Sequence, residues 1–178
     1  LALIGDEQAD RLTVSTLPAS HSWFHADEER IFSRLDAMSG FLDVLGRQTG
    51  RLMQLGLEPE PFGHFHDTDG AIRFFNGLRN RSRRPELIER HLGLTYDTCH
   101  FAILREEPEF TLSAWEENNI ALCKVQFSNA LECRICGEED LERLRQFDDG
   151  VYFHQTSILH REGSMLFPDL PLSLIHIS

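Results

Sequence analysis

Hydrophobic and polar positions along this chain alternate between short apolar runs and longer stretches with helical spacing. The apolar runs predict buried strands at 11–17, 52–57, 92–96, 120–127 and 151–154. Apolar residues three and four positions apart predict helices at 27–50, 69–78, 85–91, 108–118 and 138–147. A hairpin is expected at 157–167, around Glu162 and Gly163. The chain therefore repeats a strand–helix unit, with about five strands.

Two of the predicted helices have apolar faces that we expect to point into the core. The helix at 27–50 ends where Gly50 can act as its C-cap. Its expected inward face consists of Ile31, Leu35, Met38, Leu42 and Leu45. The helix at 138–147 is expected to turn Leu141, Leu144 and Phe147 inward.

The alternation of strands and helices determines the expected fold class. Strands joined through helices are parallel and have right-handed crossovers. A doubly wound sheet is the alternative, but no glycine-rich phosphate loop follows the first predicted strand. We therefore expect an α/β fold, specifically a partial (β/α)8 TIM barrel with about five parallel strands present.

Charge and hydropathy narrow the possible partners. The 178 residues contain 17 Lys and Arg against 29 Asp and Glu, a net charge of −12. Such a surface repels phosphate backbones, so we expect no nucleic-acid partner. The basic cluster at 79–84 is expected to be a solvated helix end. No apolar run approaches the ~20 residues of a membrane span, so we expect no membrane insertion and a cytoplasmic location.

The two ends of the sequence suggest a piece of a longer protein. The first residues, Leu1-Ala2-Leu3-Ile4-Gly5, have the character of an internal segment. Residues 172–178 match the translation of an adapter used in sequencing libraries, and a short terminal strand is the alternative. We expect residues 1–171 to form the partial barrel domain and residues 172–178 to be foreign to it.

The four cysteines give a weak signal. Cys133 and Cys136 form a lone CxxC, whereas a zinc ribbon needs a second pair at a matching distance. A thioredoxin-type pair opens a helix after a strand, and this pair lies in a β-like run. We interpret all four as ordinary reduced thiols of a cytosolic protein.

Polar side chains stand where the predicted strands end. In a barrel these positions face one mouth, so side chains from successive strands converge there. Glu58, Asp97 and His100 are the candidate ligands of a divalent metal. Their oxygen and nitrogen atoms suit Mg²⁺, Mn²⁺ or Zn²⁺.

Further residues are candidates around this mouth. Glu58 and His154 are the candidate catalytic acid/base groups. The candidate substrate-binding residues are Glu60, Lys124, Gln126 and Ser128. Alternatives stay open, because glutamates beside prolines can cap a loop, Asp-x-x-His can form a local turn, and His154 can be a core residue. His64 and His66 are expected to be exposed rather than ligands.

Five ordered motifs carry a resemblance to a known family. They are Val14-Ser15-Thr16-Leu17-Pro18, Leu57-Glu58-Pro59-Glu60-Pro61, Tyr96-Asp97-Thr98-Cys99-His100, Lys124-Val125-Gln126-Phe127-Ser128-Asn129-Ala130-Leu131 and Tyr152-Phe153-His154-Gln155. In this order they resemble the metabolite traffic protein EboE family, which looks like the xylose-isomerase-like TIM barrels. The resemblance covers about residues 11–171 and implies a longer full-length protein.

The resemblance also implies roles for individual residues. In the wider superfamily, a divalent metal is typically held by Glu, Asp, His and Glu at successive strand ends. Glu58 and Asp97 match the first two, and His100 matches the histidine that commonly follows the Asp. Gln126 stands where the superfamily usually has its metal histidine, which is a departure from the pattern.

Two functions follow as expectations. The first is an EboE-like metabolite traffic protein that binds or converts a small polar metabolite, by metal-assisted isomerisation or epimerisation if it is an enzyme. The alternative is a non-catalytic metabolite-binding or handling protein with a degenerate metal site. A functional link to other proteins of the same gene cluster is implied. Cleavage of DNA phosphodiesters is disfavoured by the charge.

Overall fold

Strands and helices alternate through most of the chain. The structure is a computed structural model that describes residues 9–151, 154–161 and 163–177. The first part contains β1 (Arg11–Thr16), α1 (Glu28–Thr49), β2 (Leu52–Leu57), α2 (Thr68–Arg81), α3 (Pro85–His91), β3 (Leu92–Asp97), α4 (Thr98–Leu104), α5 (Pro108–Glu117) and β4 (Ala121–Gln126). The strands and helices predicted in this part are confirmed within a few residues, and α4 was missed.

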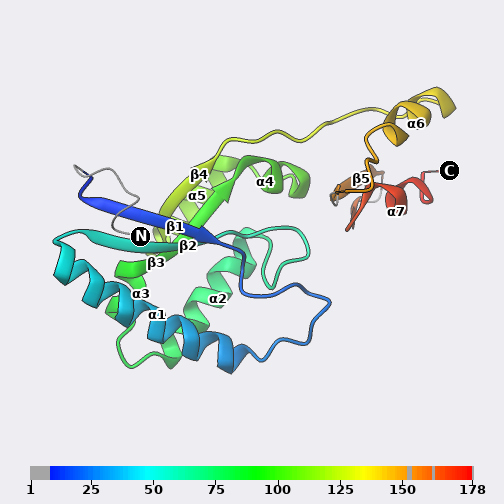
Figure 1. The fold of residues 1–178 in the computed structure, drawn as a ribbon. Helices are drawn as coiled ribbons and strands as arrows, with labels where there is room; N and C mark the ends of the chain where they lie inside the picture. Colours follow the sequence, from blue (N-terminus) through cyan, green and yellow to red (C-terminus); the bar gives the residue numbers. More distant parts are fainter. Residues whose placement is uncertain (1–8, 152–153, 162, 178) are drawn as a thin grey trace.

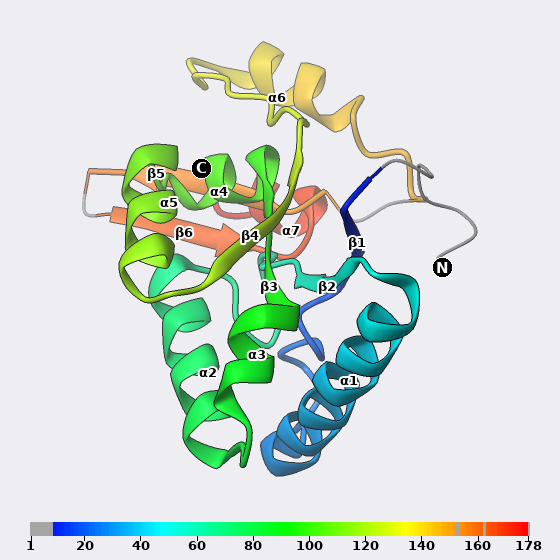
Figure 2. The same ribbon diagram turned by 90° about the vertical axis from the view of Figure 1, so that its left-hand side faces the viewer.

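The first four strands form one parallel sheet in the order β1-β2-β3-β4 (Figure 1). The sheet is so strongly curled that its two edge strands, β1 and β4, are joined by hydrogen bonds. Arg11 Nη2 on β1 donates to the Leu122 carbonyl on β4 at 2.6 Å, and Lys124 Nζ donates to Ser15 Oγ at 3.0 Å. The described part of the chain is therefore an α/β half-barrel, consistent with a partial α/β barrel (Figure 2).

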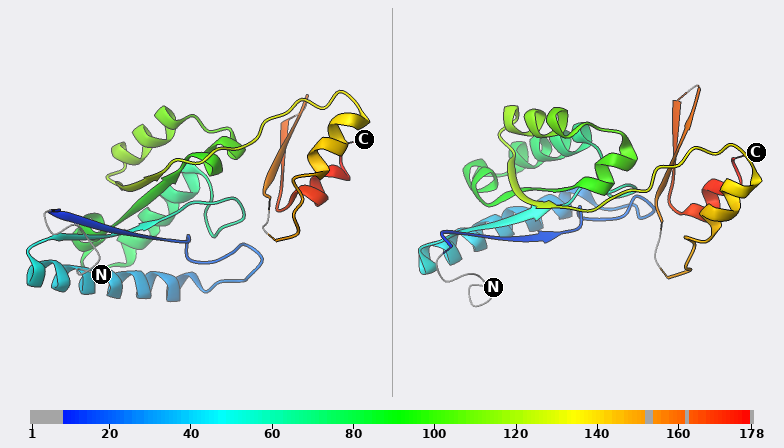
Figure 3. Two further views of the ribbon diagram at one scale, coloured as in Figure 1. Left: turned by 45° about the horizontal axis from the view of Figure 1, so that its top comes forward. Right: turned by 90° about the horizontal axis from the view of Figure 1, so that it is seen from above.

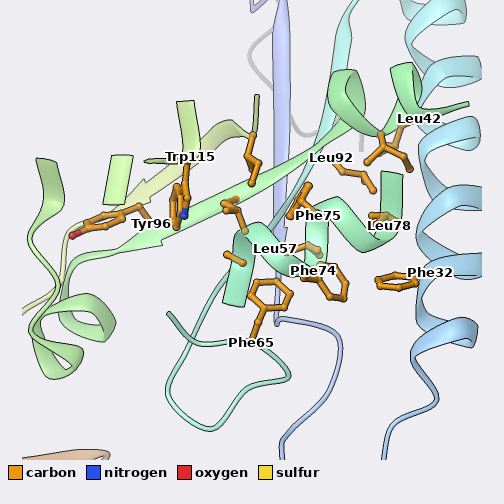
Figure 4. Close-up of a cluster of buried hydrophobic side chains, with 14 of the residues drawn as sticks. Phe32, Leu42, Leu57, Phe65, Phe74, Phe75, Leu78, Leu92, Tyr96 and Trp115 are labelled. Atoms are coloured by element: carbon orange, nitrogen blue, oxygen red, sulfur yellow. The ribbon is translucent and has the colours of Figure 1, made fainter. Parts of the chain in front are cut away.

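Helices cover the outer side of the curled sheet and form the main core with it (Figure 4). The apolar residues of β2 and β3 meet aromatic side chains of α1, α2 and α5 there. The largest buried members include Phe75, Trp115, Phe101, Leu57 and Leu92. Successive side chains of a strand point to opposite faces, so the strand residues that do not face the helices point to the inside of the curl.

Helix α1 has its predicted bounds, and Ile31, Leu35, Leu42 and Leu45 of its predicted inward face lie in or against the core. The Asp27 side chain accepts from Arg30 N at its start, and Gly50 ends it in the left-handed conformation with φ 71°. The most deeply buried residues are Phe32, Ser39 and Leu42, whereas Met38 is 40% exposed. The prediction of Met38 as a core residue was wrong, and Phe32, which was not predicted, is buried with its ring centroid 5.1 Å from that of Phe74.

A buried polar cluster ties α2 to the start of α5. The hydroxyl oxygens of Thr68 and Thr111 lie 2.9 Å apart, within hydrogen-bond distance, and both side chains are buried. The carboxylate of Glu106 accepts from Thr68 N at 3.1 Å and also bonds the Thr68 hydroxyl. The cluster supplies the first turn of α2 with a negative partner for its free N–H groups.

The basic cluster at 79–84 is only partly the solvated helix end that the sequence predicted. Arg79 has a side-chain exposure of 13%, and its Nη2 donates to the carbonyls of Asn118 and Asn119 at 2.8 and 2.7 Å. This guanidinium therefore satisfies the two carbonyls that follow the end of α5. Arg81 pairs with Glu29 at 2.6 Å on the surface, which is closer to the prediction.

The chain beyond β4 forms a small second unit, joined by the extended segment 127–137 (Figure 3). It contains α6 (Glu138–Arg145), β5 (Thr156–His160), β6 (Gly163–Phe167) and α7 (Leu170–Leu174). Strands β5 and β6 form an antiparallel hairpin, as predicted. In α6 Leu141 is buried as expected, but Phe147 lies beyond the helix and is 53% exposed.

The fifth parallel strand predicted at 151–154 is not part of the described sheet. Val151 and His154 are outside any strand, and residues 152 and 153 lie outside the described residues. Helix α7 runs across position 172, with Leu170 and Ser173 buried. That residues 172–178 are foreign to the protein stays a prediction. No helix among the described residues is long and apolar enough to cross a membrane.

Candidate functional site

The polar residues predicted at three strand ends lie together at one edge of the half-barrel. Glu58 follows β2, Asp97 ends β3, and Gln126 ends β4. Because parallel strands end at the same edge, and Asp97 pairs in register with Gln126, their side chains meet. His100 joins them from α4, whose N-cap is Asp97.

Gln126 connects the two carboxylates. Its Nε2 donates to Glu58 Oε1 at 2.7 Å and to Asp97 Oδ2 at 2.9 Å. Its Oε1 accepts from Lys124 Nζ at 2.5 Å, and Lys124 also donates to Ser15 Oγ. An ammonium group has only donors, so the amide oxygen faces Lys124 and the amide nitrogen faces the carboxylates.

The second oxygen of Asp97 is also fully engaged. Asp97 Oδ1 accepts from Cys99 N at 2.9 Å and from the Ser128 hydroxyl. Ser128 is itself held by Thr98, since Thr98 Oγ1 donates to the Ser128 carbonyl at 2.6 Å and accepts from Ser128 N at 2.8 Å. The first turn of α4 and the segment after β4 are therefore locked to one carboxylate.

His100 completes the cluster on the side of β2. Its Nδ1 lies 3.2 Å from the Pro59 carbonyl and 3.6 Å from Glu58 Oε1. The side chains of His100 and Glu58 are 16% and 13% exposed. Nδ1 of His100 therefore faces two acceptors, the Pro59 carbonyl and the Glu58 carboxylate.

The environment moves the pKa values of the acidic groups in opposite directions. Burial raises the pKa of Glu58, and the nearby Asp97 charge adds to this, whereas His100, Lys124 and Gln126 oppose it. Burial also raises the pKa of Glu60, against the opposing charge of His100. For Asp97 burial acts upward, but hydrogen bonds from Ser128 and Cys99 outweigh it and lower the pKa.

One group of side chains could hold a metal ion. Asp97, Cys99 and His100 each offer a ligand atom, and these atoms lie within 4.8 Å of one another. Carboxylate, thiolate and imidazole together suit Zn²⁺ with one position left for a ligand. Burial raises the pKa of the Cys99 thiol, so a metal would have to displace its proton.

The metal set predicted from the sequence shares Asp97 and His100 with this group. Glu58 as a third ligand stays a prediction, and in this structure the Gln126 amide donates to both carboxylates. The donor set that the structure supports contains Cys99 in place of Glu58. The sequence held the signal for Cys99 in the Asp97-Thr98-Cys99-His100 turn, but the thiol was interpreted as an ordinary one.

The other predicted site residues lie at varying distances from this cluster. Lys124 and Ser128 belong to it through the bonds above. The charges of His100 and Glu58 act on the pKa of Glu60, which is therefore close to both. His154 is in the second unit, where its backbone N–H donates to Asp169 Oδ1 at 2.9 Å. Among the described residues, no hydrogen bond or ion pair joins it to Glu58, Asp97 or His100.

His64 and His66 lie away from the strand ends. They line a groove of about 400 Å³ between α1 and α2, together with Glu28, Phe32 and Arg81. His64 Nε2 is 3.6 Å from Glu28 Oε1, and the His66 side chain is 43% exposed. Neither contributes to the group of metal-competent side chains found in the described residues.

The CxxC pair has a different setting from the one expected. Cys133 and Cys136 are exposed in the segment 127–137, which is a loop rather than a β-like run. Cys136 N donates to Asp140 Oδ2 at 2.9 Å, just before α6.

Comparison of the sequence with protein-family models and with curated proteins produced no match. The class that the structure defines is therefore a mixed α/β protein with a parallel, curled half-barrel sheet and a polar cluster at the carboxyl ends of its strands.

Proposed function

We propose that this chain is part of an EboE-like, xylose-isomerase-like barrel that binds a small polar metabolite at the strand-end cluster. Its partner is a metabolite rich in hydroxyl or carbonyl oxygens, and its location is cytoplasmic. A functional link to other proteins of the same gene cluster belongs to the same proposal. The order of the five sequence motifs supports the family, and the half-barrel supports the fold.

A single observation carries the metabolite site: Glu58, Asp97 and Gln126 come from three strand ends and meet within hydrogen-bond distance. Such a cluster offers carboxylate acceptors, an amide and an imidazole in one half-buried place. Hydroxyl groups need donors and acceptors side by side, and strand-end clusters of this kind are where barrels bind small ligands.

A second candidate function is metal-assisted isomerisation or epimerisation of the metabolite. The group of Asp97, Cys99 and His100 favours it, because these residues could hold a divalent cation. Such a cation would polarise a carbonyl or hydroxyl oxygen. Glu58, whose pKa is raised by burial, would move a proton beside it. His154 stays a predicted acid/base group.

The metabolite proposal is tested by ligand binding with matched acid variants. Thermal shift and calorimetry with a panel of aldoses, ketoses and polyols should find a class that stabilises the chain. Asp97→Asn removes the charge but keeps a good N-cap residue, so it should abolish this binding without unfolding α4.

Asp67→Asn is the control, since Asp67 caps α2 in the same way but lies outside the cluster. Its ligand binding should equal that of the unsubstituted chain. If every compound fails to bind, or if Asp97→Asn binds as well as Asp67→Asn, the proposal is wrong.

A further inference from the structure

The position between the carboxylates of Glu58 and Asp97 is one that a cation would favour. Two carboxylates that face a common point repel each other unless a positive group or several donors lie between them. In this structure the point is occupied by Gln126 Nε2, at 2.7 and 2.9 Å from the two oxygens. An amide that donates two hydrogen bonds is neutral and cannot balance the charge alone.

Lys124 supplies the positive charge behind this amide. Its ammonium donates to Gln126 Oε1 at 2.5 Å, on the side of the amide opposite to the carboxylates. A charged donor polarises the amide, and bonds in a chain of this kind strengthen one another. The ammonium also donates to Ser15 Oγ on β1. The chain of donors therefore starts at Lys124 on the fourth strand, which is also held to the first strand, and ends on the two carboxylates.

The arrangement is fixed in one direction. If the amide of Gln126 were turned over, its nitrogen would face the ammonium and its oxygen would face Glu58 and Asp97. Donor would then face donor and acceptor would face acceptor on both sides. Asp97 cannot turn to release the amide, because Ser128 and Cys99 hold its other oxygen.

We propose that Lys124 and Gln126 form a built-in substitute for a divalent cation between Glu58 and Asp97. We call them the Lys124–Gln126 donor pair. The carboxylates are neutralised by the protein itself, so no metal ion is shared by Glu58 and Asp97. Any metal that the chain takes up is held without Glu58, through the Asp97, Cys99 and His100 group. For the metabolite, and resting there on the proposed function, the pair predicts binding that resists EDTA.

Replacing the Gln126 amide by a metal ligand should allow Glu58 and Asp97 to share a metal ion. Gln126→His places an imidazole beside two carboxylates and removes the donor to them, which completes a set for Co²⁺ or Zn²⁺. We expect this variant to bind Co²⁺ about tenfold or more tightly than the unsubstituted chain, measured by calorimetry and by the visible absorption of Co²⁺. Gln48→His is the control, since Gln48 is an exposed residue of α1, and it should leave the affinity unchanged.

A second variant covers the case in which Gln126→His fails to fold, as judged by circular dichroism. Lys124 is exposed, so Lys124→Met should keep the fold while removing the positive charge. It should also raise the Co²⁺ affinity. A folded Gln126→His or Lys124→Met that shows no gain would overturn the proposal.

Metal binding by the unsubstituted chain is an independent test of the proposal. If it binds one equivalent of Zn²⁺ or Co²⁺ and Glu58→Gln weakens that binding, the two carboxylates share a metal and the donor pair is wrong. If Cys99→Ala weakens binding and Glu58→Gln does not, or if no metal binds, the proposal stands. These outcomes do not depend on the metabolite, so they separate the failure of this inference from the failure of the proposed function.

Discussion

Gln126 Nε2 lies 2.7 Å from Glu58 Oε1, although the two residues stand at the ends of strands that are not neighbours. Strand β3 separates β2 from β4, so a flat sheet would hold these side chains about 10 Å apart. The contact exists because the sheet curls until its edges meet through Lys124 and Ser15. The cluster therefore depends on the curvature of the half-barrel and also holds it.

This coupling predicts that Gln126→Ala lowers the free energy of unfolding. The substitution leaves the Asp97 carboxylate buried without its amide partner and removes the hydrogen bond that joins the ends of β2 and β4 through Glu58. We expect a loss of about 1–3 kcal/mol, measured by urea denaturation. Gln48→Ala on exposed α1 is the control and should change stability very little. Equal effects of the two substitutions would contradict the coupling.

The buried hydroxyl of Thr68 leads to a second prediction, which concerns stability. Thr68→Val keeps the shape of the side chain but removes the hydroxyl that bonds Thr111 and Glu106. The partners lie in a buried setting, so we expect about 1–3 kcal/mol of lost stability in urea denaturation. Thr13→Val on exposed β1 is the matched control, and valine should be tolerated there. A Thr68→Val protein as stable as this control would show that the buried cluster contributes nothing.

Much of the fold could be predicted from the sequence because it is encoded locally. The apolar run 52–57 and the spacing in 69–78 identified β2 and α2, and Gly50 marked the end of α1. The local sequence pattern gave wrong predictions where tertiary contacts determine which residues are buried. Met38 has the same spacing as its buried neighbours, but Phe32 takes the contact with Phe74. Helix α4 was missed because its first residues, Thr98, Cys99 and His100, were interpreted as a turn that leaves the strand.

The candidate site was predictable in its position but not in its bonding. Strand ends in a parallel sheet share an edge, so Glu58, Asp97 and Gln126 could be placed together from their order alone. That Gln126 donates to both carboxylates depends on the curl of the sheet and on the bond from Lys124 to the Gln126 amide oxygen, and a sequence pattern shows neither the curl nor that bond. The position of His154 depended on a fifth strand that the described sheet does not contain.

Close packing inside the curled sheet gives a third prediction. A Cβ at Gly93 would lie 2.6 Å from Cys123 Sγ and would also meet the Ala121 carbonyl, which belongs to the backbone of β4. Since that carbonyl cannot move without disturbing the β3–β4 pairing, Gly93→Ala should cost about 1–3 kcal/mol. Gly137→Ala is the control, because a Cβ there meets nothing within 4 Å and the extended φ of −177° suits alanine. Similar melting temperatures for the two variants would contradict this packing.

The four thiols should react with iodoacetamide in an order set by exposure and pKa. Burial raises the pKa of Cys123 and of Cys99, which lowers the thiolate fraction of both near neutral pH. Burial and the Asp140 and Glu132 charges also raise the pKa of Cys133, but this thiol is exposed, as is Cys136. We expect mass spectrometry to find Cys133 and Cys136 modified first and Cys123 last. In urea the four rates should converge, and early labelling of Cys123 without urea would contradict its place inside the half-barrel.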